Sequence, residues 1–513
     1  MTAMNHGGIY LSELLDGFAS VEADQDKQIM GIELDSRTVH QGDCFIAING
    51  TESHGVDFIA DAFCKGAVAI LVDSEDVSLI PEQLMKKNKN NIIFVDQLAV
   101  KTGEIAHRYY GQPTDLMKVF GVTGTNGKTS VSNFIGQAID KISGSGTCGV
   151  IGTLGSGLFG EFVSSGMTTP DAIRMHLSLS RLRDQGAQAT VIEASSHGLA
   201  QHRLSGVDFD VAVFTNLSRD HLDYHGDMQT YGAAKLELFK SPDLQAAVIN
   251  LDDPFSEKIL QVLSDNVQVF GYTLGLDSHP GITVIRCSKL DFSVKGLIME
   301  IDTPQGSNAL RANLLGRFNA SNLLAAMAAL MACGFHFEEV LDALSEMVGV
   351  PGRMEAFVKD AQAAVVVDFA HTPDGLTKAL ETLKEISSGK LWCVFGCGGD
   401  RDKGKRPLMG DVVEKLADTI IVTNDNPRSE EPSIIASGIL SGMKKPGKAK
   451  VIFDRKLAIE TAIKSAHPKD IILVAGKGHE NWQEIKGQRF PFNDRNVVLN
   501  TIGNVIGEGA KND

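Results

Sequence analysis

Three features that would mark a membrane, secreted or nucleic-acid-binding protein are missing from this sequence. No apolar stretch reaches the roughly 18 residues that a membrane-spanning helix needs. The first ten residues, MTAMNHGGIY, lack the basic segment and apolar run of a signal peptide. Acidic residues outnumber basic ones, and the formal net charge of −16 argues against general affinity for nucleic acid. We therefore expect a cytoplasmic protein with no membrane insertion and no nucleic-acid partner.

Paired cysteines are also missing. The seven cysteines lie apart, and the one close pair, Cys393 and Cys397 in CVFGC, has the spacing of neither a CxxC motif nor a zinc ribbon. This pattern favours a reducing compartment over a disulfide framework. With 43% hydrophobic and 22% charged residues, the composition is that of an ordinary globular protein whose core needs no disulfides.

Short and nearly continuous apolar runs are abundant, and they alternate with stretches of helical character. Runs of this kind are typical of parallel strands that are buried on both faces. The sequence therefore predicts an α/β protein, and its length of 513 residues indicates several domains. The runs are AVAILV, NIIFV, KVFGVTG, QATVIEA, VAVFTN, AAVIN, AAVVVDFA, LWCVFG, DTIIVT, KVIF and DIILVAG.

We divide the chain into three regions. Residues 1–110 form a small α/β region, and residues 111–350 form a larger one that opens with VFGVTGTNGKTS. The stretch VGVPGRME has the composition of a linker, and residues 351–513 form a third α/β region.

The stretch KVFGVTGTNGKTSVSNF predicts a strand, a glycine-rich turn and a helix. This order directs backbone N–H groups and a helix N-terminus at one point, as phosphate binding requires. Lys128 can reach the β- and γ-phosphates and Thr129 can bind Mg²⁺, although the strict GxxxxGK[ST] pattern is not met. The alternative is a glycine turn with a helix-capping threonine. Nucleotide binding is expected of Gly124, Thr125, Asn126, Gly127, Lys128, Thr129 and Ser130.

Polar residues follow the next two predicted strands. Glu193 ends QATVIEA, and Asn216, Asp220 and His221 follow VAVFTN. Ligands of open parallel sheets bind at the carboxyl ends of the strands, so these residues should converge on the phosphates. Oxygen ligands with one histidine suit Mg²⁺. The alternative for a histidine is a surface or supporting role, which we favour for His202 and His225.

Several motifs together resemble those of the Mur ligase family, and the resemblance extends over nearly the whole chain. They are GVTGTNGKTS, EASSHGL, TNLSRDHLDYHGD, GRFNASN and PGRME. The family consists of ATP-dependent amino-acid ligases that build the peptide of the peptidoglycan precursor. It implies a small N-terminal α/β domain, a central P-loop-type ATPase domain with a parallel sheet, and a Rossmann-like C-terminal domain. It also implies a monomer.

The resemblance implies a chemistry. ATP phosphorylates a substrate carboxylate, and an amine then attacks the acyl phosphate to form an amide. Lys128, His221 and two Mg²⁺ ions would offset the repulsion between the phosphates and the carboxylate. Lys235 in YGAAKLELF occupies the position of a carbamylated lysine (N6-carboxylysine), which would bind Mg²⁺ together with Thr129, Glu193 and His221. The alternative for Lys235 is an ordinary surface lysine.

The same resemblance assigns further contacts to ATP. Asn319 and Asn322 in GRFNASN match the adenine side, with helix capping as the alternative for Asn319. Arg353 in the linker and Asp368 and His371, at the end of what we take as the first strand of the third region, are expected to act between domains.

The nucleotide-sugar substrate, UDP-MurNAc-L-Ala-D-Glu, is assigned to the first two regions in the same way. Uridine and diphosphate contacts are implied for Leu34, Ser36, Thr51, Glu52 and Ser53, although this chain has TESHG where relatives often have HQADG. Contacts to the muramyl peptide are implied for Thr168, Thr169, Ser195, Gln201 and Arg203.

The third region predicts which amino acid is added. Arg401 follows one predicted strand, DNPR with Arg428 follows the next, and Glu480 follows a later one. Arginine suits the distal carboxylate of meso-diaminopimelate, and glutamate suits its distal ammonium. Lysine lacks that carboxylate and would leave an arginine unpaired. The expected diaminopimelate contacts are Arg401, Asp425, Asn426, Pro427, Arg428, Gly476 and Glu480.

Four alternatives stay open at this point. The chain could be a lysine-adding ligase, a ligase that adds D-Ala-D-Ala, or a folylpolyglutamate synthase. It could also be an inactive regulator that only binds nucleotide. The main expectation is the ATP-dependent ligation of meso-diaminopimelate to the D-Glu γ-carboxyl of UDP-MurNAc-L-Ala-D-Glu.

Overall fold

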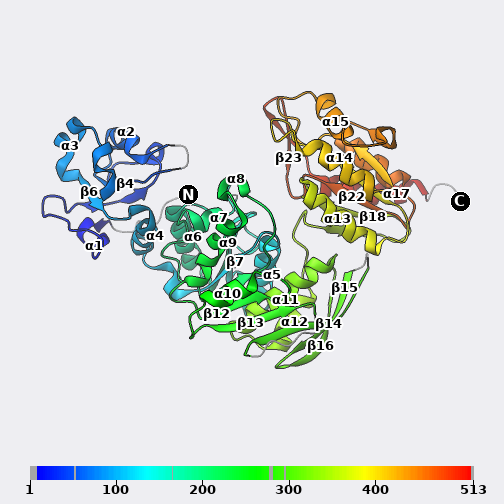
Figure 1. Ribbon diagram of the computed structural model, residues 1–513, viewed down its shortest axis with the longest axis horizontal. Helices are drawn as coiled ribbons and strands as arrows, with labels where there is room; N and C mark the ends of the chain where they lie inside the picture. Colours follow the sequence, from blue (N-terminus) through cyan, green and yellow to red (C-terminus); the bar gives the residue numbers. More distant parts are fainter. Residues whose placement is uncertain (1–7, 51–52, 164–165, 276–280, 294–295, 510–513) are drawn as a thin grey trace. The chain divides into compact units, whose positions relative to one another are not determined.

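The structure is a computed structural model that describes residues 8–50, 53–163, 166–275, 281–293 and 296–509 (Figure 1). The chain divides into two compact units. One unit consists of residues 1–273, 277–285 and 325–340, and the other of residues 274–276, 286–324 and 341–513. The first two predicted regions therefore lie mainly in the first unit, and the third region lies in the second.

The N-terminal region is built on a parallel sheet in the order β3-β4-β5-β6. Alternate residues of β4 enter two different cores: Cys44 and Ile46 pack in a cluster with α1 and α4, and Phe45 and Ala47 pack in a cluster with α2. The strands are β3 (Gly31–Glu33), β4 (Asp43–Ala47), β5 (Ala69–Asp73) and β6 (Ile92–Val95), and the helices are α1 (Leu11–Leu14), α2 (Ile59–Lys65), α3 (Glu82–Asn88) and α4 (Leu98–Tyr109).

The central sheet contains parallel strands in the order β13-β12-β11-β7-β10-β8, with β9 antiparallel at the edge. β7 therefore lies between β10 and β11, and the loops after these three strands emerge side by side. The strands are β7 (Lys118–Thr123), β8 (Cys148–Gly152), β9 (Gly155–Leu158), β10 (Ala189–Glu193), β11 (Val211–Phe214), β12 (Ala246–Asn250) and β13 (Gln268–Thr273).

Helices follow these strands in the chain. α5 packs on β7, β8 and β10, and α6 contributes Met175, Leu179 and Leu182 to the core beneath the sheet. The helices are α5 (Lys128–Ser143), α6 (Ala172–Asp184), α7 (Ser196–Ala200), α8 (Leu222–His225), α9 (Met228–Leu236), α10 (Ser256–Val262), α11 (Arg317–Ala332) and α12 (Phe337–Ser345).

An antiparallel meander was not predicted from the sequence. β14 (Thr283–Ser293), β15 (Gly296–Thr303) and β16 (Gly306–Ala312) pair in succession. In β15, Leu297, Met299 and Ile301 are buried while the residues between them are more exposed. This alternation of buried and exposed positions is the pattern of a sheet with one solvated face. The apolar run of β15, Leu297–Met299, is only three residues long and does not stand out in a search for continuous runs.

The C-terminal region has parallel strands in the order β18-β22-β19-β20-β21 and an antiparallel edge strand, β17. The prediction that Asp368 ends the first strand of this region is wrong, because β17 precedes β18. The strands are β17 (Glu355–Phe357), β18 (Ala364–Asp368), β19 (Leu391–Phe395), β20 (Thr419–Val422), β21 (Ala449–Val451) and β22 (Ile471–Ala475). A hairpin of β23 (Trp482–Ile485) and β24 (Gln488–Pro491) follows.

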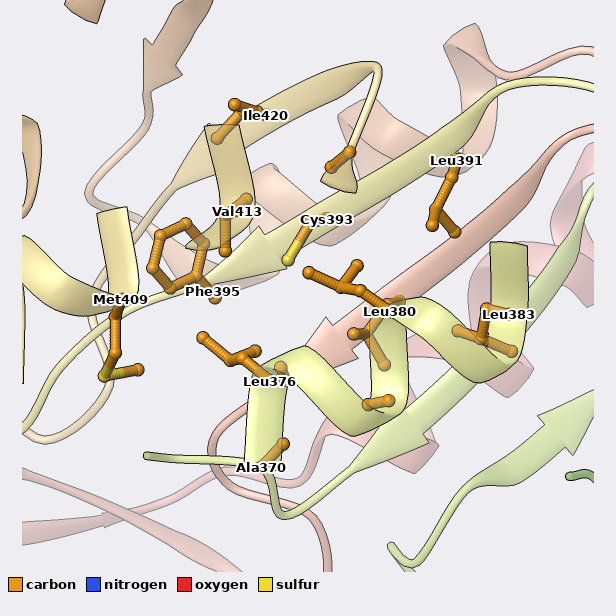
Figure 2. Close-up of a cluster of buried hydrophobic side chains, with 14 of the residues drawn as sticks. Ala370, Leu376, Leu380, Leu383, Leu391, Cys393, Phe395, Met409, Val413 and Ile420 are labelled. Atoms are coloured by element: carbon orange, nitrogen blue, oxygen red, sulfur yellow. The ribbon is translucent and has the colours of Figure 1, made fainter. Parts of the chain in front are cut away.

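Apolar side chains cover both faces of this sheet. On one face, residues of α13 and α14 such as Leu376, Leu380 and Met409 pack against Cys393 and Phe395 of β19 (Figure 2). On the other face, α16 and α17 pack against residues such as Val365 and Ile472. The helices are α13 (Pro373–Ile386), α14 (Lys405–Leu416), α15 (Pro432–Leu440), α16 (Arg455–Ser465) and α17 (Asp494–Gly509).

Each predicted apolar run overlaps one of these strands, and the α/β architecture with parallel sheets is confirmed. All seven cysteines have free thiols. Within the described ranges, we find no helix with the length and apolarity required to traverse a bilayer.

Candidate active site

The loop after β7 has the form of a phosphate-binding loop. It runs from Gly124 to Gly127, and α5 begins directly afterwards at Lys128. The ammonium of Lys128 donates to the carbonyl oxygens of Gly124 (2.6 Å) and Thr125 (3.0 Å), so it folds back over the loop. The predicted strand, glycine turn and helix are therefore present, and their N–H groups are placed for an anion.

The loop is fixed to the neighbouring strand end by hydrogen bonds. Backbone N–H groups of Thr125 and Asn126 donate to the carbonyl and side-chain oxygens of Asn216, and the hydroxyl of Thr215 donates to the carbonyl of Asn126 (2.6 Å). Gly124 has a φ of +148°, and a Cβ there would collide with the Thr215 hydroxyl. Glycine is therefore required at this position both by conformation and by the close approach of the next strand.

A buried polar cluster lies at the start of α5. The hydroxyl of Thr129 donates to Oε2 of Glu193 (2.9 Å), and Thr153 donates to both carboxylate oxygens, through its backbone N–H (2.9 Å) and its hydroxyl (3.0 Å). Thr153 also lies 3.1 Å from the Thr168 hydroxyl. Thr129 and Glu193 are thus brought together as predicted, and the oxygen-rich donor set suits Mg²⁺. The sequence analysis missed Thr153, because it follows β8, a strand that was not predicted.

Lys235 is not a surface lysine. Its side chain in α9 is 1% exposed, and its ammonium lies 4.4 Å from the centre of the Tyr231 ring. Burial, and secondarily the charge of Lys128, lower the pKa of Lys235 to about 6. Burial therefore favours the neutral amine, which is the form that adds to CO₂.

His221 is the most exposed of the predicted metal ligands. Its Nε2 lies 3.6 Å from Asp220, and its ring contacts that of His197 edge to face at 4.9 Å. His221 has a φ of +53° and immediately precedes α8. Within the described part of the chain, His107, Asp115 and Asp208 form a separate group of side chains close enough to share an ion. Thr129 is joined to Glu193 by a hydrogen bond, whereas the side chain of His221 contacts Asp220 and His197.

The residues assigned to the muramyl peptide form a connected network. The Thr169 hydroxyl donates to Glu193 O (2.7 Å) and lies 2.9 Å from the Ser195 hydroxyl, which accepts from Gly198 N at the start of α7. Arg203 donates to Thr169 O (2.7 Å) and to Gln201 Oε1 (2.9 Å from Nε). Four of the five predicted contacts are joined to one another here, and Thr168 is joined to Thr153.

The residues assigned to uridine lie around the end of β3. Leu34 is half-buried, and Ser36 is buried at the start of a 3-10 turn capped by Asp35. Ser53 is exposed, and its carbonyl accepts from Gly50 N (3.0 Å). Thr51 and Glu52 lie outside the described residues.

Asn319 and Asn322 share one face of α11, as predicted. Asn322 donates to Asn319 Oδ1 (3.2 Å), and Asn319 donates to the carbonyl of Leu315 (2.9 Å). α11 begins at Arg317, so the alternative in which Asn319 caps the helix is wrong.

Asp368 is buried, and its carboxylate accepts from Met354 N (2.7 Å) and Ala370 N (2.8 Å). Burial raises the pKa of Asp368, and the nearby charge of Arg353 opposes this shift. Arg353 stacks 4.9 Å over the ring of Phe369, and His371 Nδ1 lies 2.8 Å from Phe369 O. Asp368 therefore holds the start of the third region to the end of β18.

The DNPR turn is held by the β23–β24 hairpin. The backbone N–H of Arg428 donates to Glu484 O (3.0 Å), and Arg428 O accepts from Lys486 N (2.6 Å). Arg428 is half-buried with a φ of +50°. Its Nη1 donates to Gly399 O (2.7 Å), and its Nε lies 3.7 Å from the Glu484 carboxylate. The turn thus fixes the position of this arginine through its main chain.

Gly398 brings the two predicted arginines together. A Cβ at this position would lie 2.9 Å from Nη1 of Arg428 and 3.6 Å from Cγ of Arg401. Arg401 is exposed. Glu430, which follows DNPR, pairs bidentately with the buried Arg406 (2.8 and 3.0 Å) and therefore secures the loop instead of facing the arginine pair.

A buried lysine, Lys477, links the loop after β20 to the loop after β22. The Lys477 ammonium donates to Glu480 Oε2 (2.6 Å) and to Asn426 Oδ1 (3.0 Å), and Asn426 Nδ2 donates to the same Glu480 oxygen (2.9 Å). Glu480 is the anionic residue that the sequence predicted. Lys477 was missed, because a lysine between two glycines reads as an exposed loop residue.

Beneath these loops, Arg455 pairs with Asp494, and both side chains are fully buried. Arg455 also donates to the carbonyl oxygens of Asn424 (3.4 Å) and Ala475 (3.0 Å), the residues that directly precede Asp425 and Gly476. Lys477 and Arg455 thus hold the predicted site residues at 425–428 and 476–480 in one cluster. Neither residue belongs to a recognisable local sequence motif.

Comparison with known protein families matches three parts of the chain. The Mur ligase family catalytic domain matches residues 28–110, the Mur ligase middle domain matches 122–330, and the Mur ligase glutamate ligase domain matches 352–478. The chain belongs to the Mur ligase family. The phosphate loop lies in the match to the middle domain, and the arginine pair lies in the match to the glutamate ligase domain.

Among relatives within the Mur ligase family, three carry the name UDP-N-acetylmuramoyl-L-alanyl-D-glutamate–2,6-diaminopimelate ligase. The protein of Ectopseudomonas mendocina is 45% identical over 466 residues (91% of this chain and 93% of that protein). That of Pseudomonas aeruginosa is 44% identical over 473 residues (92% and 95%), and that of Coxiella burnetii is 43% identical over 487 residues (95% and 98%).

Solved structures of Mur ligases agree with this assignment. A structure of a protein with the same name is 35% identical and superposes with a TM-score of 0.73, covering 97% of this chain and 99% of that chain. A crystal structure of MurF from Acinetobacter baumannii is 18% identical with a TM-score of 0.61, covering 97% of this chain and 99% of that one, and shows a shared fold alone.

Proposed function

We propose that this Mur ligase joins meso-diaminopimelate to the D-Glu γ-carboxyl of UDP-MurNAc-L-Ala-D-Glu, with conversion of ATP to ADP and phosphate. The reaction belongs to the synthesis of the peptidoglycan precursor, and we propose that it takes place in the cytoplasm with a monomeric enzyme. The observation that carries the choice of amino acid is the cluster of Arg401, Arg428 and Glu480 at adjacent strand ends. The names of the relatives that match more than nine-tenths of the chain support the same choice.

The cluster has the charges that diaminopimelate requires at its distal end. The arginine pair at Gly398 can receive the distal carboxylate, and a bidentate arginine–carboxylate contact is directional as well as strong. Glu480 can receive the distal ammonium. Lysine would satisfy Glu480 but offer no carboxylate to the arginine pair, so Arg428 would keep only its contacts with Gly399 O and Glu484. The missing ligand contact corresponds to about 1–3 kcal/mol.

The reaction proceeds in two steps. An oxygen of the γ-carboxylate attacks the γ-phosphorus of ATP, ADP departs, and an acyl phosphate forms. The amine of the incoming amino acid then attacks the acyl carbon, phosphate departs, and the nitrogen loses a proton. The loop from Gly124 to Ser130 holds the β- and γ-phosphates, and Lys128 stabilises the charge that is transferred. Contacts with ATP are also proposed for Asn319, Asn322, Arg353 and Asp368.

Mg²⁺ would be held by Thr129, Glu193, His221 and a carbamate on Lys235. When bound, such ions neutralise phosphate charge during transfer. The burial of Lys235, which lowers the pKa of its amine, supports the carbamate, because the neutral amine is the form that adds CO₂. The product would be an anion, which can bind a metal where a cation would oppose it.

The nucleotide-sugar substrate would lie along the first two regions. Uridine contacts are proposed for Leu34 and Ser36 and diphosphate contacts for residues 51–53. The network of Thr168, Thr169, Ser195, Gln201 and Arg203 would hold the muramyl peptide, and its link to Glu193 through Thr169 would couple the position of the γ-carboxylate to the metal site.

Phosphate release tests this function. The purified enzyme is given ATP, Mg²⁺ and UDP-MurNAc-L-Ala-D-Glu together with meso-diaminopimelate, L-lysine or D-Ala-D-Ala in turn. We expect turnover with diaminopimelate and little with the other two. Turnover with lysine or D-Ala-D-Ala alone would assign the chain to another member of the family, and absence of turnover with all three would refute the ligase assignment.

A further inference from the structure

The glutamate that we assign to the ammonium of diaminopimelate is itself held by a buried lysine. Lys477 has no exposed surface, so its ammonium cannot touch a ligand bound at Glu480. Its charge is balanced by Glu480, whose side chain is 23% exposed. One partner of this ion pair is therefore sealed in the protein, and the other reaches the surface.

The hydrogen bonds fix one oxygen of Glu480 in particular. Lys477 Nζ (2.6 Å) and Asn426 Nδ2 (2.9 Å) both donate to Oε2, which leaves Oε1 outside this network. Asn426 is held in turn, because its Oδ1 accepts from Lys477 (3.0 Å) and from the backbone N–H of Glu484 (3.0 Å). The carboxylate thus has one anchored oxygen and one that is available to accept another hydrogen bond.

The network also joins separate parts of the fold. Asn426 belongs to the loop after β20, Lys477 and Glu480 to the loop after β22, and Glu484 to the hairpin that holds Arg428. The position of Glu480 relative to Arg428 is therefore set through Lys477 and Asn426. A side chain with one fixed oxygen and a fixed neighbour loses little freedom when a ligand binds, which favours affinity and selectivity.

We propose that Lys477 is a positioning residue for amino-acid selection: it anchors Glu480 by Oε2 so that Oε1 accepts the distal ammonium of diaminopimelate. The proposal rests on the proposed function. Lys477 would therefore help the enzyme to distinguish amino acids with a distal ammonium from those without one, although Lys477 itself does not contact the ligand.

The test uses two amino acids that differ only in this group. L-2-Aminopimelate has the reacting amine and both carboxylates of diaminopimelate but no distal ammonium. Phosphate release by the full-length enzyme gives kcat/KM for each. We expect Lys477→Met to lower kcat/KM for diaminopimelate by about 10- to 100-fold, the range of a lost charged contact, and to change that for 2-aminopimelate by less than about threefold. KM for ATP should stay unchanged.

Glu480→Gln supplies the second half of the test. If Lys477 acts through Glu480, the single variants should each lose the preference for diaminopimelate, and the double variant should lose no more than either alone. Lys415→Met, at an exposed lysine paired with Asp411 on α14, is the matched control and should keep the preference.

Three results would overturn the proposal: equal losses with both amino acids, additive losses in the double variant, or an unchanged preference in Lys477→Met. Thermal unfolding is recorded for each variant. If Lys477→Met does not fold, Lys477→Gln decides, because its shorter and uncharged side chain weakens the anchor at Oε2: a reduced preference supports the proposal and an unchanged one overturns it. A wild-type enzyme without turnover on diaminopimelate would refute the proposed function instead.

Discussion

The phosphate loop and the arginine–glutamate cluster represent two ways of building a site at the end of a parallel sheet. The phosphate loop is contiguous in sequence, and its binding groups are main-chain N–H groups whose direction follows from the strand, the turn and the helix. The arginine–glutamate cluster draws residues from three loops, and buried charged side chains hold those loops in place. The contiguous site takes its shape mainly from local conformation, with Thr215 and Asn216 fixing the loop from the next strand. The assembled site depends on buried side chains that are distant in sequence for the position of every loop.

Loss of Lys235 should have the largest effect. Lys235→Ala removes the group that we expect to become an anion for Mg²⁺, so ligation should fall by about 10³-fold while the fold is kept. Phosphate release measures the loss of activity. Added short carboxylates should restore part of the activity, because the variant lacks an anionic ligand for Mg²⁺ but keeps its fold.

Lys240→Ala, at an exposed lysine paired with Glu237, is the control and should retain activity. Full activity of Lys235→Ala would exclude the carbamate. A ¹³C NMR signal from ¹³C-bicarbonate in wild-type enzyme that is lost in Lys235→Ala would support it.

Removal of Arg455 should show how strongly the second site depends on buried charge. Arg455→Met leaves Asp494 buried without its partner and frees the carbonyls of Asn424 and Ala475, so the free energy of unfolding should fall by about 3–5 kcal/mol. Urea unfolding followed by circular dichroism measures this value.

Arg489→Met is the comparison variant, because Arg489 is exposed and stacks on Trp482 at 4.2 Å. It should change the stability by less than about 1 kcal/mol. Equal effects of the two changes would contradict the conclusion that the arginine–glutamate cluster depends on buried charged side chains for its support.

Arg428→Ala should affect the use of diaminopimelate and spare the nucleotide site. Loss of its contact with the distal carboxylate should lower kcat/KM for diaminopimelate by about 10- to 100-fold, which corresponds to about 1–3 kcal/mol. KM for ATP should not change. Parallel losses for ATP and diaminopimelate, measured by phosphate release, would give Arg428 a structural role.

Arg401→Ala should have the smallest effect. Arg401 is exposed, and solvent weakens its attraction for a carboxylate, so kcat/KM for diaminopimelate should fall by less than about fivefold. The same assay with increasing salt should reduce the difference between variant and wild type, because exposed charges are screened. A loss larger than that of Arg428→Ala would reverse the order of importance within the pair.

The sequence predicted the first site better than the second for a physical reason. Gly124, Lys128 and Thr129 lie within six residues, and a strand followed by a helix leaves little choice in their arrangement. Lys477 and Arg455 carry no such signal, because whether a lysine or arginine is buried depends on partners as distant as Asn426 and Asp494. Thr153 and the β14–β16 meander were missed because the apolar runs in β8 and β15, VI and LIM, are shorter than those on which the prediction relied.

The left-handed backbone at Arg428 has a consequence for redesign of the enzyme. Two main-chain hydrogen bonds to the hairpin hold this residue, so its position does not depend on which side chain it carries. A φ of +50° is tolerated by asparagine, aspartate and glycine and is strained for β-branched residues. A library at position 428 should therefore fold with small polar residues and fail with valine or isoleucine. The charge that faces the incoming amino acid can therefore be changed by substitution at position 428, but only to residue types that tolerate a positive φ.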